Sequence, residues 1–206
     1  MPELIDLESR LIAALPEDIG FSICGGYLRD KLFGREPSDI DVVVSREIAF
    51  EDVRLERFPG FVPEENEYED NMVVGEYESP IEGCPYQILY RGDGQHIPES
   101  QVRYHVCGLS NIFFYNDNLI VHRTFLKDWA GRVIRVSPKY RGELTDGDFN
   151  YLRRMCRYFP DWRVDYVEQN RPQAFDPQLF NEAAEALRRD VPADDAPPPA
   201  PFRDDF

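Results

Sequence analysis

A short stretch near the N-terminus, residues 21–45 (FSICGGYLRDKLFGREPSDIDVVVS), limits the possible folds more than any other part of the chain. It ends in an apolar strand that carries Asp39 and Asp41. Because strand side chains alternate between two faces, these aspartates point the same way, roughly 7 Å apart, while Ile40 points into the core. Two carboxylates on one face repel each other unless they share a cation, and such hard oxygen ligands suit Mg²⁺ or Mn²⁺. The spacing therefore predicts a divalent cation site.

A pair of glycines, Gly25 and Gly26, lies between the strand FSIC and a short helix predicted over residues 27–33. Glycine lets the backbone approach a ligand closely, and the free N–H groups at the start of a helix favour an anion. An anion site and a dication site about twenty residues apart fit a nucleoside triphosphate with its metals.

These residues carry a resemblance to a known family. The run GGYLRDKLFG followed by DID resembles the head-domain signature of the polymerase-beta-like nucleotidyltransferase superfamily. It is most similar to the class II branch, which contains tRNA CCA-adding enzymes and bacterial poly(A) polymerases. The resemblance implies an α+β fold, with a mixed, mostly antiparallel sheet flanked by helices. It also implies metal-dependent transfer of a nucleoside monophosphate from an NTP to a hydroxyl, with release of pyrophosphate.

The same resemblance assigns roles within the stretch. Asp39 and Asp41 would be the catalytic metal ligands, and Gly25, Gly26 and Arg29 would contact the triphosphate. The implied acceptor is an RNA 3′ end, tRNA in particular, although a protein or small-molecule hydroxyl stays open.

Later motifs match the family less completely. Gln87 stands where class II relatives carry a glutamate regarded as a third carboxylate. Asn111 falls at the family asparagine, but a preceding Arg-Arg-Asp triplet is replaced by residues 105–107, His-Val-Cys. Because that triplet helps bind the triphosphate and choose the ribose in relatives, selectivity for ribonucleotides is not secured by this sequence.

A helix predicted over residues 147–159 contains the last motif. Asp148 aligns with an aspartate that pairs with the incoming base in relatives, while Tyr151 replaces the arginine partner. Arg154 and Arg157 match the basic positions that follow and are assigned to phosphate. For Arg157, a solvated basic helix face explains the residue equally well.

Other segments predict ordinary elements of a globular domain. Helices are expected over residues 2–15 and 46–57, and a strand and turn over 84–94. Further strands are expected at 72–74, 113–115, 119–124 and 132–136, with a short connector at 127–129. The four cysteines are scattered without ligand spacing and are expected to be buried, reduced thiols.

The 206 residues suffice for one good core and a small appendage. We expect a head domain over residues 1–160, a helical extension over 161–189, and a disordered, acidic, proline-rich tail over 190–206. The helical RNA-holding domains of the family would need more chain, so a minimal head is predicted. The tail could dock a protein partner, but a purely solvating role is favoured.

The formal net charge of −16 bears on partners. Proteins that grip long nucleic acids usually present basic surfaces, so RNA must meet a local patch here. No apolar run reaches membrane-spanning length and the N-terminus is acidic, so a cytoplasmic protein without membrane contact is expected. The incomplete motifs leave an alternative: a nucleotide-binding or inhibitory protein of phage or toxin type that has kept the fold and lost efficient chemistry.

Overall fold

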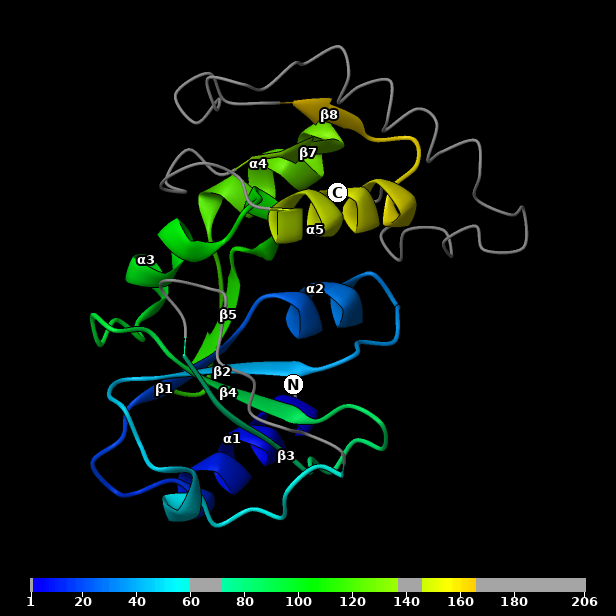
Figure 1. Cartoon of the computed structure of the whole chain (residues 1–206). Helices are drawn as coiled ribbons and strands as arrows, with labels where there is room; N and C mark the ends of the chain where they lie inside the picture. The colour runs from blue at the N-terminus through cyan, green and yellow to red at the C-terminus, as the bar shows by residue number, and fades with distance from the viewer. Residues whose placement is uncertain (1, 60–71, 137–145, 166–206) are drawn as a thin grey trace. The chain divides into compact units, whose positions relative to one another are not determined.

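The computed structural model describes residues 2–59, 72–136 and 146–165, and divides the chain into two compact units (Figure 1). The first unit comprises Met1–Gln101 and Ile112–Ile120, and the second comprises Val102–Asn111 and Val121–Phe206.

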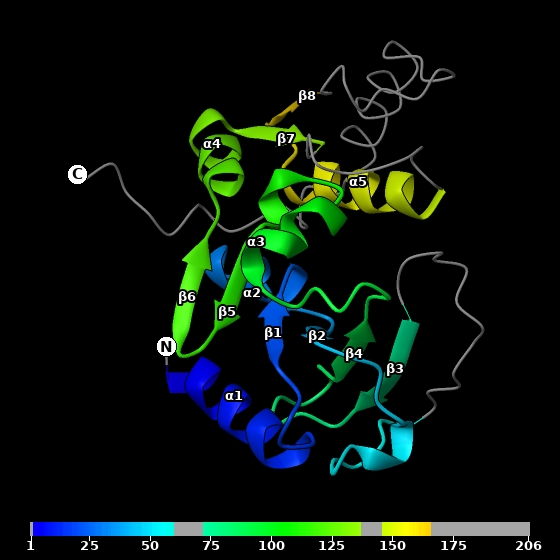
Figure 2. The same cartoon turned by 90° about the vertical axis from the view of Figure 1, so that its left-hand side faces the viewer.

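A six-stranded sheet forms the first unit, in the order β3-β4-β2-β1-β5-β6 (Figure 2). β1 pairs antiparallel with both β2 and β5, and β3 with β4, whereas β2 and β4 run parallel. The sheet is thus mixed and mostly antiparallel, as predicted. The strands are β1 (Phe21–Cys24), β2 (Ile40–Val44), β3 (Met72–Tyr77), β4 (Tyr86–Tyr90), β5 (Ile112–Tyr115) and β6 (Asn118–Val121).

Two helices flank this sheet. Helix α1 (Pro2–Ala14) buries Leu7 and Leu11, and the Tyr86 hydroxyl of β4 donates to the Leu7 carbonyl at 3.3 Å. Helix α2 (Gly26–Leu32) follows β1 directly and lies on the other side of the sheet (Figure 1). The short helix α3 (Pro98–Gln101) completes the unit.

The second unit is smaller among the described residues. Helix α4 (Arg123–Gly131) leads into β7 (Val133–Arg135), which pairs in parallel with β8 (Arg163–Asp165). Helix α5 (Asp146–Tyr158) lies between β7 and β8 in the sequence and buries an apolar stripe of Leu152, Met155 and Cys156. Three 3₁₀ turns, Phe50–Asp52 in the first unit and Val102–Tyr104 and Gly108–Ser110 in the second, complete the regular structure.

Most predicted elements agree with the structure to within about two residues, which is the usual uncertainty of helix and strand ends. The helix at residues 2–15, the strand FSIC and the helix at 147–159 are confirmed. All four cysteine side chains are buried, as expected.

Three element predictions are wrong. Residues 46–57 form no α-helix but only the turn Phe50–Asp52, since the buried Ile48 and Val53 are five residues apart and do not share a helix face. The strand expected over residues 119–124 ends at Val121, because the side chain of His122 accepts a hydrogen bond from the Thr124 backbone N–H and starts α4. The expected connector at 127–129 consequently lies inside that helix.

Among the described helices, none combines the length and apolar character needed to cross a membrane. The expected tail, and all of the predicted extension beyond residue 165, lie outside the described residues.

Candidate functional site

The predicted acidic pair lies at the start of β2. Asp39 directly precedes the strand and Asp41 is its second residue, with the fully buried Ile40 between them. Asp41 pairs in register with Cys24 of β1 on one side and with Gln87 of β4 on the other. Both carboxylates are half-buried, and neither forms an ion pair with another described residue. The pair is therefore open to a ligand on one face of the sheet.

The glycine turn lies against this pair. Gly25 has a φ of 74°, in the region that favours glycine, and a Cβ atom added there would lie 3.0 Å from Asp41 Oδ2. The backbone N–H of Gly26 donates a hydrogen bond to the Asp41 carboxylate. The glycine pair and the acidic strand are thus in contact. The N–H of Gly26, which was predicted to face an anion, faces the Asp41 carboxylate.

The environment of Asp41 disfavours the ionised form of its carboxyl group. Burial and the neighbouring charge of Asp39 raise its pKa to about 7, against lowering effects from Arg91, Arg29 and the Gly26 N–H. The two causes that raise the pKa are those that a bound cation would relieve, because a cation stabilises both ionised carboxylates.

Two buried arginines supply positive charge near Asp41. Arg29 is 2% exposed and forms a two-pronged ion pair with Asp30, at 2.7 Å and 2.8 Å. Arg91 is also buried and donates to the side chain of Gln101. Arg29 therefore lies beside the site but is engaged by its neighbour, and its contact with triphosphate stays a prediction. Arg91 was not among the predicted site residues, although it directly follows the strand that carries Gln87.

The donor set fits a divalent cation whose coordination is completed by other oxygens. Asp39 and Asp41 offer hard carboxylate oxygens on one sheet face, and Gly25 leaves room beside Asp41. No cluster of three or more His, Cys, Asp and Glu side chains suited to a metal occurs within residues 2–59, 72–136 and 146–165. Two protein carboxylates supplemented by substrate phosphates and water are the usual arrangement for Mg²⁺.

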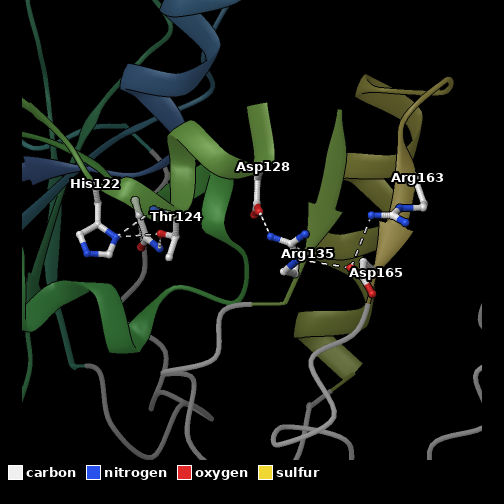
Figure 3. Close-up of polar contacts among 7 residues, drawn as sticks. His122, Thr124, Asp128, Arg135, Arg163 and Asp165 are labelled. Atoms are coloured by element: carbon white, nitrogen blue, oxygen red, sulfur yellow. Dashed lines mark hydrogen bonds and ion pairs between the residues drawn. The ribbon is translucent and has the colours of Figure 1, made fainter. Parts of the chain in front are cut away.

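Asn111 belongs to the second unit, where it is fully buried. Its Oδ1 accepts from His105 Nδ1 at 3.0 Å, and its Nδ2 donates to Thr124 Oγ1 at 2.8 Å. Thr124 in turn lies 2.8 Å from Nδ1 of His122, the residue that caps α4 (Figure 3). Both ends of the Asn111 amide are thus engaged within the unit.

Arg154 and Arg157 also belong to the second unit, on exposed positions of α5 together with Arg153. The guanidinium of Arg154 lies 5.4 Å from the ring centre of Tyr151. The Tyr151 hydroxyl bonds to Ser110 and lies 3.7 Å from Cys107 Sγ. Tyr151 is therefore held to the segment before β5, whereas the arginines face solvent.

An ion-pair chain lies elsewhere in this unit (Figure 3). Arg135 of β7 bonds to the buried Asp128 at 2.9 Å and to Asp165 at 3.4 Å, and Arg163 approaches Asp165 at 3.7 Å. Gly108 leaves the room that Asp128 occupies, since a Cβ atom there would overlap the carboxylate. These ion pairs join α4, β7 and β8, which indicates a structural role.

Solved structures with a similar fold are tRNA-processing enzymes. A tRNA-processing enzyme in apo form I has a TM-score of 0.54 and 18% identity, covering 93% of this chain and 50% of that one. A CCA-adding enzyme in apo form I has a TM-score of 0.52 and 18% identity, and the match covers 90% of this chain and 43% of that one. A tRNA nucleotidyltransferase complexed with a primer tRNA and an incoming ATP analog has a TM-score of 0.50 and 16% identity. That match covers 82% of this chain and 48% of that one.

The chain has the fold of the CCA-adding enzymes' head domain. It spans about half the length of those solved chains. Comparison with protein-family models and with curated proteins gave no match. At this identity the likeness to CCA-adding enzymes establishes the fold, while the roles of individual residues depend on the geometry above.

One further residue in the same cross-strand row as Asp41 was missed by sequence reasoning. Glu76 lies in β3 at the end of an acidic segment that resembles a solvated charge run. No sequence signal marks it, because its position depends on an irregularity in strand pairing.

Proposed function

We propose that the protein is a metal-dependent nucleotidyltransferase that moves a nucleoside monophosphate from an NTP to a hydroxyl acceptor. The observation that carries the proposal is the contact of Asp41 with the Gly25-Gly26 turn, beside Asp39 and on one half-open sheet face. The shared fold with tRNA nucleotidyltransferases supports the same reaction class.

In this proposal Asp39 and Asp41 hold Mg²⁺ or Mn²⁺. The bound cation would lower the pKa of the acceptor hydroxyl and stabilise charge on the transferring phosphoryl group. The hydroxyl loses its proton to water and its oxygen bonds to the α-phosphorus. The bond from that phosphorus to the bridging oxygen breaks, and pyrophosphate leaves with the electron pair. The chain's contribution is to let the phosphates approach the backbone closely at the Gly25-Gly26 turn, whose own N–H groups donate to the Ile112 carbonyl and to Asp41. Arg29 and Arg91 would supply positive charge near the carboxylates.

Exposed arginines in the second unit support a nucleic-acid acceptor, such as an RNA or tRNA 3′ end. Over its full sequence this unit carries as many arginine and lysine residues as aspartate and glutamate residues, whereas the first unit is strongly acidic. The exposed arginines at 153, 154 and 157 of α5 form a local basic surface of the kind that an acidic chain needs to meet phosphate. Asn111 would stabilise the unit from its interior.

Labelled NTPs test the proposal directly. The protein is incubated with each α-labelled NTP, Mg²⁺ and either total RNA or cell lysate, and pyrophosphate release and label transfer are measured. The native protein should label a macromolecule, whereas Asp39→Ala and a chelator should each abolish transfer. Full activity of Asp39→Ala would overturn the mechanism. NTP binding without pyrophosphate release over the acceptor panel would instead favour a nucleotide-binding protein without efficient chemistry.

A further inference from the structure

A row of paired residues crosses the sheet at the candidate site. Asp41 of β2 is in register with Gln87 of β4, which is in register with Glu76 of the edge strand β3. Residues paired across strands share a face, so these three side chains stand on the side of the sheet that carries Asp39. Asp41, Gln87 and Glu76 are each half-buried, so the row is accessible along its length.

The Gln87 amide has a defined orientation within this row. Its Nε2 donates to Glu76 Oε1 at 3.2 Å. A carboxylate accepts hydrogen bonds and donates none, so it attracts the NH₂ end of the amide and repels the carbonyl oxygen. Gln87 Oε1 therefore turns away from Glu76, and the next paired residue on that side is Asp41.

A β-bulge in β3 places Glu76 opposite Gln87, where it accepts the hydrogen bond from the amide. The register between β3 and β4 shifts between Val73 and Gly75, and Val74 has no partner in β4. Without the extra residue, Gly75 would oppose Gln87. Bulges commonly re-aim a side chain next to a functional site. The phenyl ring of Phe50 packs against Gly75 in this bulge, where a Cβ atom would overlap it.

We infer that Glu76 is a positioning residue for the divalent cation site: it fixes the Gln87 amide so that a neutral oxygen, and not an NH₂ group, faces the cation held by Asp39 and Asp41. This inference rests on the proposed function. An amide oxygen is a suitable hard ligand for Mg²⁺ or Mn²⁺, whereas an amide NH₂ facing the same point would repel the cation.

Mn²⁺ binding to the nucleotide-free protein tests this inference without relying on activity. Free Mn²⁺ is followed by its electron paramagnetic resonance signal in a titration. Glu76→Gln should weaken Mn²⁺ affinity about fivefold, the effect expected from one hydrogen bond. Gln87→Met should weaken it by a similar factor. Glu78→Gln, which removes the same charge from an exposed residue just after β3, is the matched control and should leave the affinity unchanged.

The combined variants separate positioning from simple charge. In a Gln87→Met background, Glu76→Gln should cause no further loss, because the oriented amide is already gone. The exchanged pair, Glu76→Gln with Gln87→Glu, keeps the net charge and the hydrogen bond and places a carboxylate beside Asp41, so it should bind Mn²⁺ at least as tightly as the native protein. A loss from Glu76→Gln that persists in the Gln87→Met background, or no loss at all, would overturn the positioning role.

Failure of the underlying site has a different signature. If Asp41→Asn binds Mn²⁺ as tightly as the native protein, the cation site itself is refuted and the inference with it. Thermal unfolding of each variant shows whether a loss of binding reflects a loss of the fold.

Discussion

Oδ2 of Asp41 lies against the backbone of Gly25, so close that any side chain at residue 25 would meet the carboxylate. The contact joins the turn after β1 to the first residues of β2. It makes the geometry of the candidate site sensitive to a single methyl group.

Replacing Gly25 with alanine should therefore damage the site as well as the backbone. The backbone of Gly25, with φ 74° and ψ −127°, is a conformation that residues with a Cβ rarely adopt, so an alanine there costs about 1–3 kcal/mol of folding free energy, and the added Cβ displaces Asp41. We expect Mn²⁺ affinity and nucleotidyl transfer to fall at least about tenfold. Calorimetric titration and the labelled-NTP assay measure these two quantities.

Gly34→Ala is the matched control. Gly34 has a φ of 68°, and no atom lies within 4 Å of a Cβ added there. Its positive φ should also lower the free energy of unfolding of the alanine variant, whereas Mn²⁺ binding should stay intact. Equal binding losses in the two variants would show that backbone strain, and not the contact with Asp41, controls the site.

Asp128 should make stability depend on pH. Burial raises its pKa from 3.8 to about 7, although Arg135 opposes the shift. The folded protein thus holds a proton that the unfolded chain releases, so the contribution of this group to stability is full below pH 3.8 and declines as the pH rises to about 7. Asp128→Asn cannot titrate. As the pH rises from 3.8 to about 7, the free energy of unfolding of Asp128→Asn should therefore increase relative to that of the native protein, by at most about 1.4 kcal/mol per pH unit.

Urea unfolding at a series of pH values measures this difference. The lost ion pair with Arg135 adds an offset, so only the trend with pH is informative. A difference between the two proteins that does not vary with pH would contradict the burial argument.

Asn111→Ala should destabilise the second unit. The change leaves buried hydrogen-bonding groups of His105 and Thr124 without their amide partner, at a cost of about 1–3 kcal/mol. Thermal or urea unfolding followed by circular dichroism reports the loss. Asn150→Ala, at an exposed position of α5, serves for comparison and should change stability by less than about 0.5 kcal/mol. Near-native stability of Asn111→Ala would argue for a direct ligand role.

Arg154→Gln with Arg157→Gln should weaken RNA binding without affecting stability. Both side chains are exposed on α5, so their removal disturbs no core. If each contacts one phosphate of single-stranded RNA, the slope of log affinity against log salt should become shallower by about 1.4. Fluorescence anisotropy with a labelled oligonucleotide at several salt concentrations gives the slope. An unchanged slope would place RNA elsewhere, and Arg10→Gln in α1 controls for net charge.

The sequence predicted the first unit well where function and local pattern agree. The strand FSIC, the glycine turn and the alternation of Asp39, Ile40 and Asp41 each depend on neighbouring residues alone. The contact between Asp41 and Gly25 follows once β1 and β2 pair.

What sequence could not predict depends on register and on distant partners. Glu76 reaches Gln87 only because of an extra residue in β3, which the alternation of apolar residues does not reveal. Arg29 matches a motif, but its bidentate pairing with Asp30 inside the fold is a property of packing. His122 as the cap of α4 was missed because the predicted strand was extended from the apolar residues 119–121 through the polar residues 122–124, His-Arg-Thr.

The irregular pairing of β3 also bears on self-association. β3 is the outermost of the six strands on its side of the sheet, and its outer edge is partly covered. Arg57 forms an antiparallel bridge with Tyr77, the Phe58 N–H donates to the Glu76 carbonyl at 3.1 Å, and the Glu78 N–H donates to the Glu56 carbonyl at 2.8 Å. An uncovered strand edge is a template for a strand of a second molecule. The bulge between Val73 and Gly75 makes the preceding part of the edge uneven, so the bridge and the bulge together guard the sheet against edge-to-edge aggregation.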